Sequence, residues 1–177
     1  MADSDPPAVG RRMIRVTVLA WVAMLGFDAL LHAGLLARLY DGPNAFLLTP
    51  EQAFGRIPLG YTSFLVQALL LTWLCWRLDI RGAGEGLRFG LLLGAVIWGS
   101  LTLGLASIST APAILLVAWF VGQTVEMGIA GAVLGAGLSA DRLRRLALFV
   151  ILFVLACLVV TVALQNIGLA PPARLTP

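Results

Sequence analysis

The sequence predicts an all-α fold, a polytopic bundle of transmembrane helices, and three observations support this prediction. Hydrophobic residues make up 60% of the 177-residue chain and charged residues only 12%, whereas a soluble domain is roughly 45–50% apolar and 25% charged. The mean hydropathy is +0.96. Five segments are each long enough to cross a bilayer, which takes about 20 mostly apolar residues in a helix. We therefore expect an integral membrane protein with five spans.

The predicted spans follow one another with short connections, except for a longer loop after the first. They cover about residues 14–38, 58–77, 88–109, 113–138 and 144–168. With their connections they form a single transmembrane domain over residues 13–168. The ends, 1–12 and 169–177, are polar or rich in proline and have little to bury, so both are predicted to be disordered tails.

The arginines predict how the bundle is oriented. The chain has a net charge of +3, and its 12 basic residues are all arginines, which gather at the ends of the segments. One side receives nine of them, Arg11, Arg12, Arg15, Arg77, Arg81, Arg88, Arg142, Arg144 and Arg145, and the other side receives Arg38, Arg56 and Arg174. By the positive-inside rule the amino terminus is cytoplasmic, and an odd number of spans puts the carboxyl terminus outside. We interpret this charge as a topology signal and expect no nucleic-acid binding.

The loop between the first two spans contains a helix-start pattern. Thr49 precedes Pro50 and is followed three positions later by Gln52, which is a capping box with proline at the first helical position. We expect a short interfacial helix over about residues 50–55 at the outer surface. It could serve as a lid over a polar site or, as the favoured alternative, as a connector that caps the bundle.

Three polar side chains lie near the middle of three different spans. Asp28 is in the first span, Gln67 in the second and Glu126 in the fourth. Because an ionisable group at the centre of a bilayer costs at least about 2.5 kcal/mol, such residues usually face protein or water and often mark a functional site. The three are expected to form one polar layer.

Helical spacing adds three residues to this candidate site. His32 follows Asp28 by four positions and so projects from the same face. Gln123 and Trp119 lie on the same side of the fourth span as Glu126, with Gln123 about one turn closer to the outside. We expect a ligand or proton site that opens outward and is lined by these residues.

Glycines predict how the helices approach one another. Gly90 and Gly94 in the third span, and Gly128, Gly131 and Gly135 in the fourth, have the spacing that lets helix backbones pack closely in a membrane. This face of the fourth span points away from Glu126, so the fourth span should be central. The fifth span is apolar all round and is expected to be a peripheral, lipid-facing addition to a four-helix core.

The segments GLLLGAVIWG in the third span and WFVGQTVEMGIAG in the fourth, with an acidic residue inside the first, carry a resemblance. Over about residues 14–138 the chain resembles small bacterial multi-pass membrane proteins classified as domains of unknown function. The resemblance implies a four-helix unit in a bacterial cytoplasmic membrane and supplies no substrate. The fifth span departs from that pattern.

Three classes of function stay open. The first is a protein that binds or translocates a small molecule or a proton at the polar layer. The second is a non-catalytic subunit that assembles with a membrane partner or a second copy, in which the polar residues only tie helices together. The third is an intramembrane enzyme with Glu126 or His32 as general acid or base. This class is the least favoured, because no nucleophile accompanies these two residues. One histidine without ligand spacing predicts no metal site, and we expect no cofactor.

Overall fold

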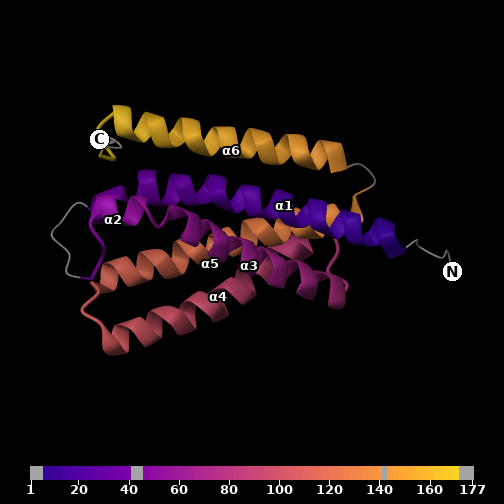
Figure 1. Ribbon diagram of the computed structural model, residues 1–177, viewed down its shortest axis with the longest axis horizontal. Coiled ribbons are helices and arrows are strands. Elements are labelled where there is room, and N and C mark those ends of the chain that lie inside the picture. Colours follow the sequence, from indigo (N-terminus) through magenta and orange to yellow (C-terminus); the bar gives the residue numbers. More distant parts are fainter. Residues whose placement is uncertain (1–5, 41–45, 141–142, 172–177) are drawn as a thin grey trace.

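The computed structural model describes residues 6–40, 46–140 and 143–171. Within these residues the regular structure is helical throughout, and five helices are long and apolar enough to cross a membrane. The prediction of an all-α protein with five candidate spans is therefore confirmed (Figure 1).

The helices run alternately up and down the molecule (Figure 1). In chain order they are α1 (Pro6–Leu30), a π-helical turn (Leu31–Leu35), a 3₁₀ turn (Ala37–Tyr40), α2 (Pro50–Phe54), α3 (Ile57–Arg77), α4 (Ala83–Ile108), α5 (Ala113–Ser139) and α6 (Leu143–Asn166). The starts of α1, α4 and α6 and the ends of α3 and α5 thus share one end of the molecule, which we call the arginine-rich end. The other end carries the loop with α2.

Two arginines close the arginine-rich end around the carboxyl end of α5. The guanidinium of Arg12 donates to the carbonyl oxygens of Gly137, at 2.9 and 3.2 Å, and of Ala140. Arg81 donates to the carbonyl of Leu138 at 3.2 Å. The last carbonyls of a helix have no partner within it, and cations are favoured beside them. Arg12 thus joins α1 to α5, and Arg81 joins the α3–α4 turn to α5. Both also belong to the arginines that predict the topology.

Two segments predicted to belong to disordered tails, residues 6–12 and 169–171, are ordered in the described structure. Residues 6–12 were expected in a disordered tail, but α1 begins at Pro6, because proline suits the first turn of a helix and Arg12 anchors the segment that follows. Residues 169–171 were also assigned to a tail, yet Arg38 donates to the Leu169 carbonyl at 2.8 Å and Ala170 is buried. The remaining tail residues, 1–5 and 172–177, lie outside the described structure.

Helices α4 and α5 are joined by their glycines. A methyl group added to Gly90 would lie 2.2 Å from the Met127 carbonyl oxygen, and one added to Gly131 would lie 2.1 Å from that of Gly86. The close contact between the two segments continues to Gly135, where an added carbon would lie 2.3 Å from the Gly82 carbonyl oxygen. Backbone therefore touches backbone along this interface, and Gly86 belongs to it in addition to the five predicted glycines. The glycine faces of α4 and α5 are thus buried against each other within one chain.

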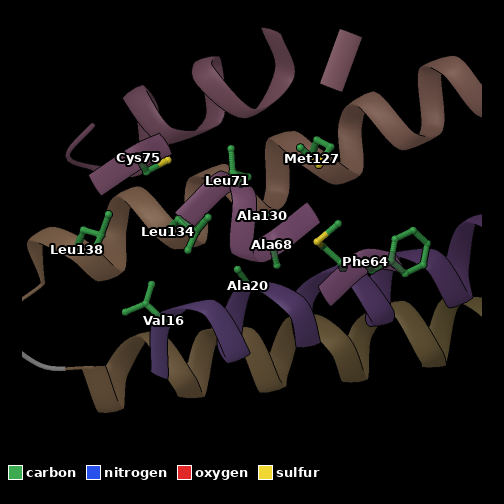
Figure 2. Close-up of a cluster of buried hydrophobic side chains, with 11 residues drawn as sticks. Val16, Ala20, Phe64, Ala68, Leu71, Cys75, Met127, Ala130, Leu134 and Leu138 are labelled. Atoms are coloured by element: carbon green, nitrogen blue, oxygen red, sulfur yellow. The ribbon is translucent and has the colours of Figure 1, made fainter. Parts of the chain in front are cut away.

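The hydrophobic core lies between α1, α3 and α5. Figure 2 shows side chains from these three helices converging, among them Ala20 of α1, Leu71 of α3 and Leu134 of α5. A buried hydrogen bond of 2.8 Å between the hydroxyls of Thr17 and Thr72 ties α1 to α3 beside this core. Helix α5 contacts α1, α3, α4 and α6, so it occupies the centre.

Helix α6 packs mainly along α1, on the opposite side of the molecule from α4 (Figure 1). Gly26 of α1 lets it approach, since a methyl group added there would lie 2.7 Å from the Cγ2 atom of Val154. The far side of α6 exposes large apolar residues, including Phe149 and Val159. An apolar surface of this kind suits contact with lipid.

Candidate functional site

The first span does not continue as a regular α-helix to residue 38, as the sequence had predicted. After Leu30 the chain widens into the π-helical turn, in which the Leu36 amide donates to the Leu31 carbonyl at 2.8 Å, and it then tightens into the 3₁₀ turn that ends at Tyr40. Short π-helical turns inside α-helices are often found at functional sites. Here the two turns return the chain toward α5 and place Tyr40 beside His32.

His32 is the centre of a hydrogen-bonded polar cluster. Its Nε2 atom lies 3.3 Å from the Oδ1 atom of Asp28 and 3.2 Å from the amide nitrogen of Gln123. Its Nδ1 atom lies 2.6 Å from the hydroxyl of Tyr40. The structure therefore brings together Asp28 and His32 of the first span with Gln123 of α5.

Tyr40 connects this cluster to Trp119, which the sequence analysis had placed beside the site. The indole nitrogen of Trp119 donates to the Tyr40 hydroxyl at 2.8 Å, and the same hydroxyl is hydrogen-bonded to Nδ1 of His32. A neutral imidazole donates from one ring nitrogen and accepts at the other, so the tautomer of His32 sets the direction of its hydrogen bonds. The rings of His32 and Tyr40 are stacked, with centroids 5.7 Å apart.

The Tyr40 hydroxyl is held in its neutral form. Burial raises the pKa of this hydroxyl to about 12; the hydrogen bond from Trp119 acts in the opposite direction, and the nearby Asp28 carboxyl acts in the same direction as burial. Since a neutral phenol can both accept and donate a hydrogen bond, Tyr40 serves as the link between Trp119 and His32. The sequence does not predict this role for Tyr40, because residue 40 lies beyond the predicted first span.

Glu126 lies one turn along α5 from Gln123 and is fully buried, with 0% of its surface exposed. Neither carboxyl oxygen has a hydrogen-bond partner among the described residues. The Gln123 amide and the Asp28 carboxyl are close enough to interact with it electrostatically, but the geometry with Gln123 is not that of a hydrogen bond. The Glu126 carboxyl thus lies about one helical turn from the network around His32, on the side of the arginine-rich end, and makes no hydrogen bond with the described residues.

Gln67 was predicted to share the polar layer, but no hydrogen bond among the described residues joins it to the cluster. Its amide oxygen is buried and has no hydrogen-bond partner in the described part of the chain, and it lies beside the core positions Phe64 and Ala68 of α3. Helix α3 therefore contributes less to the site than α1 and α5 do.

The loop after Tyr40 contributes one aromatic residue above the site. The ring of Phe46 lies 6.1 Å from that of Trp119. Further along, the capping box forms as two reciprocal bonds, from the Thr49 amide to the Gln52 side-chain oxygen at 3.2 Å and from the Gln52 amide to the Thr49 hydroxyl at 3.4 Å. The side chains of α2 from Gln52 to Phe54 are exposed. The cover over the cluster thus comes from Tyr40 and Phe46, and α2 itself lies apart.

No protein family, curated protein or solved structure that was compared matches the chain. The resemblance over residues 14–138 therefore stays a prediction. Among the described residues there is also no group of three or more His, Cys, Asp or Glu side chains that could hold a metal ion. The geometry of the polar cluster is therefore the main structural indication of function.

Proposed function

We propose that this protein lies in a bacterial cytoplasmic membrane and takes up a small cation, either a proton or a protonated amine, from the outer side. The cation is held by Asp28, His32, Gln123 and Glu126. Under this proposal the amino terminus is cytoplasmic, as the arginine distribution indicates, and the end with Tyr40 and Phe46 faces outward.

The observation that carries the proposal is the state of Glu126. Burying an ionised group away from water without a partner is so costly that the group instead becomes neutral or acquires a counter-charge. Both carboxyl oxygens of Glu126 are buried and unpartnered among the described residues. The carboxyl therefore either carries a proton or meets a cation that binds beside it.

Charge balance favours a positive ligand. The cluster holds two carboxyl groups, those of Asp28 and Glu126, and one imidazole, so His32 can neutralise at most one of them. The described arginines lie toward the ends of the helices. A proton or a small cation supplies the charge that the protein side chains lack, and ionisable residues within membranes frequently form such pathways.

The exposed fractions of the side chains give an order of approach. The His32 side chain is 31% exposed and that of Asp28 is 18% exposed, whereas Glu126 is completely buried. A cation that passes Tyr40 meets His32 and Asp28 before Glu126. The rings of Tyr40 and Trp119 along this route add the attraction of aromatic faces for cations.

Proton and amine uptake by proteoliposomes tests the proposal. Vesicles are loaded with a pH-sensitive dye, a membrane potential is imposed, and the rate of proton entry is measured; radiolabelled methylammonium is measured in parallel. We expect the wild-type protein to raise at least one of these rates above that of protein-free vesicles. Glu126→Gln and Asp28→Asn should abolish the increase because each removes an ionisable carboxyl and keeps its size.

Glu85→Gln is the matched control, because Glu85 is an exposed carboxylate at the start of α4 that pairs only loosely with Arg88, at 3.6 Å. This variant should behave as the wild type does. Size-exclusion profiles show whether each variant keeps its fold. Uptake by well-folded Glu126→Gln at the wild-type rate, or no uptake of either cation by the wild type, contradicts the proposal.

A further inference from the structure

A second candidate binding site lies at the arginine-rich end, far from the polar cluster along α1. There α1 and α6 leave an open groove of about 430 Å³ on the outside of the bundle. Its apolar walls come from Ile14, Val18 and Leu19 of α1 and from Leu143 and Ala147 of α6. Ile14 alone is 66% exposed, so the groove presents a substantial apolar surface outside the protein core.

One arginine from each helix stands on the rim of this groove. Arg15 of α1 and Arg144 of α6 both line it and are both exposed. Neither makes a hydrogen bond or an ion pair with the described residues. This distinguishes them from Arg12, which is bound to the end of α5. Guanidinium groups offer several donors in a plane that matches the oxygens of a phosphate.

We propose that this groove binds one anionic phospholipid. The phosphate of the lipid lies between Arg15 and Arg144, and an acyl chain follows Val18 and Ala147 toward the middle of the membrane. Basic pockets between transmembrane helices are suited to anionic headgroups, and the groove adds an apolar channel directly below the two charges. Together the two features fit an anionic lipid. A free phosphate would make no contact with the apolar walls, and a lipid without net charge would be attracted less strongly by the two arginines.

The position of the groove agrees with this occupant. Each of α1 and α6 is a candidate membrane span, and both begin at this end. Arg15 lies just over one turn inside the first span and Arg144 in the first turn of the last, near the level of the lipid headgroups. Arginines at such a depth keep their charge at the interface while their stems lie along apolar surface. The lipid would fill the space between α1 and α6 where these helices do not touch.

Native mass spectrometry of the intact protein in mild detergent tests the proposal. Phosphatidylglycerol and phosphatidylcholine with identical acyl chains are titrated separately, and the first dissociation constant is measured. We expect the wild type to prefer phosphatidylglycerol. Since each arginine near an anionic headgroup is worth about 1 kcal/mol, Arg15→Gln with Arg144→Gln should weaken phosphatidylglycerol binding by about 30-fold.

The matched control is Arg77→Gln with Arg88→Gln, which removes two charges from the same end of the molecule but on α3 and α4. This control should keep the wild-type affinity for phosphatidylglycerol. Ala147→Trp, which fills the groove and leaves both arginines, should weaken binding of the lipid. Size-exclusion profiles exclude unfolded variants.

Three results would overturn the proposal. The first is equal affinity of the wild type for the two lipids. The second is an equal loss of affinity in both double variants, which would indicate a general effect of charge. The third is displacement of the lipid by glycerol phosphate at a similar concentration, together with no effect of Ala147→Trp, which would assign the two arginines to a free phosphate.

Discussion

Among single residues, Tyr40 has the most readily measured environment. Its pKa is raised to about 12, mainly by burial, above the usual value of roughly 10. The folded protein therefore holds the phenolic proton more tightly than the unfolded chain does. The resulting contribution to stability is complete below pH 10 and is lost as the pH rises through about 12.

A titration of the phenol by ultraviolet absorbance checks this prediction. The chain contains two tyrosines, so Tyr61→Phe leaves Tyr40 as the only phenol. Tyr61 is exposed, and its phenol makes no hydrogen bond with the residues that the structure describes. Its backbone carbonyl accepts from the Trp21 indole at 2.9 Å, which Tyr61→Phe leaves in place, so this substitution should keep the fold. We expect a midpoint near pH 12. A midpoint near pH 10 would show that Tyr40 is not buried against His32 and Trp119.

Helical spacing explains which site residues the sequence could predict. Asp28 and His32 are four positions apart, and Gln123 and Glu126 are three apart, so each pair shares a helix face in any regular helix. Tyr40 could not be found in this way, because the π-helical and 3₁₀ turns change the direction of the chain between residues 31 and 40. Apolar length marks a span but does not show where its hydrogen bonding changes from one helix type to another.

At the scale of elements, the interface between α4 and α5 is the most sensitive to added volume. Gly90→Ala would place a carbon 2.2 Å from the Met127 carbonyl oxygen, and backbone atoms cannot move aside cheaply. Overpacking of this kind costs about 1–3 kcal/mol. We expect a clear fall in the midpoint of thermal unfolding in detergent.

Gly104→Ala is the control for this prediction. Gly104 is on the same helix, and an added carbon there meets nothing within 4 Å. Replacing glycine by alanine in an open helical position stabilises by about 0.4–1 kcal/mol. The two variants should therefore change the unfolding midpoint in opposite directions, and similar changes in both would contradict the close contact between α4 and α5.

Helix α6 supports the π-helical turn that carries His32. The side-chain amide of Gln165 donates to the Ala33 carbonyl at 3.1 Å, and Gly34 lies against Leu164, where an added carbon would approach to 3.2 Å. Arg38 also donates to the carbonyls of Gly168 and Leu169 just beyond α6. These contacts fix the π-helical and 3₁₀ turns that lead from α1 to Tyr40.

Gln165→Leu should therefore loosen the cover over the polar cluster. In the Tyr61→Phe background we expect this variant to lower the midpoint of the Tyr40 titration from about 12 toward the usual value, because the ring becomes more exposed to water. Asn166→Leu is the control, since Asn166 is the exposed neighbour of Gln165. An unchanged midpoint in Gln165→Leu would show that α6 does not position Tyr40.

The sequence predicts five spans but does not predict which helix α6 packs against. The segment is apolar on every side, so periodicity selects no face. Its place beside α1 depends on two glycines, Gly26 of α1 and Gly34 of the π-helical turn, which make room for Val154 and Leu164. Such fits are set by the shapes of both surfaces and are not visible in either segment alone.

For the whole molecule, charge and polarity are arranged in opposite halves. Most described arginines lie at the arginine-rich end, where Arg12 and Arg81 also bind the last carbonyls of α5. The polar cluster is displaced toward the other end, which carries Tyr40 and Phe46. Because charged arginines near a span end resist transfer across the bilayer, we expect the arginine-rich end to be cytoplasmic and the cluster to open outward.

Reporter fusions test this orientation. Alkaline phosphatase, which is active only outside the cytoplasm, should be active when fused to the carboxyl terminus of the full chain, and green fluorescent protein fused there should be dark. Inserted in the turn between α3 and α4, at residues 79–82, the two reporters should give the opposite result, because this turn belongs to the arginine-rich end. Fluorescence at the carboxyl terminus would reverse the orientation and place the entrance to the polar cluster on the cytoplasmic side, so that uptake from outside could no longer be its role.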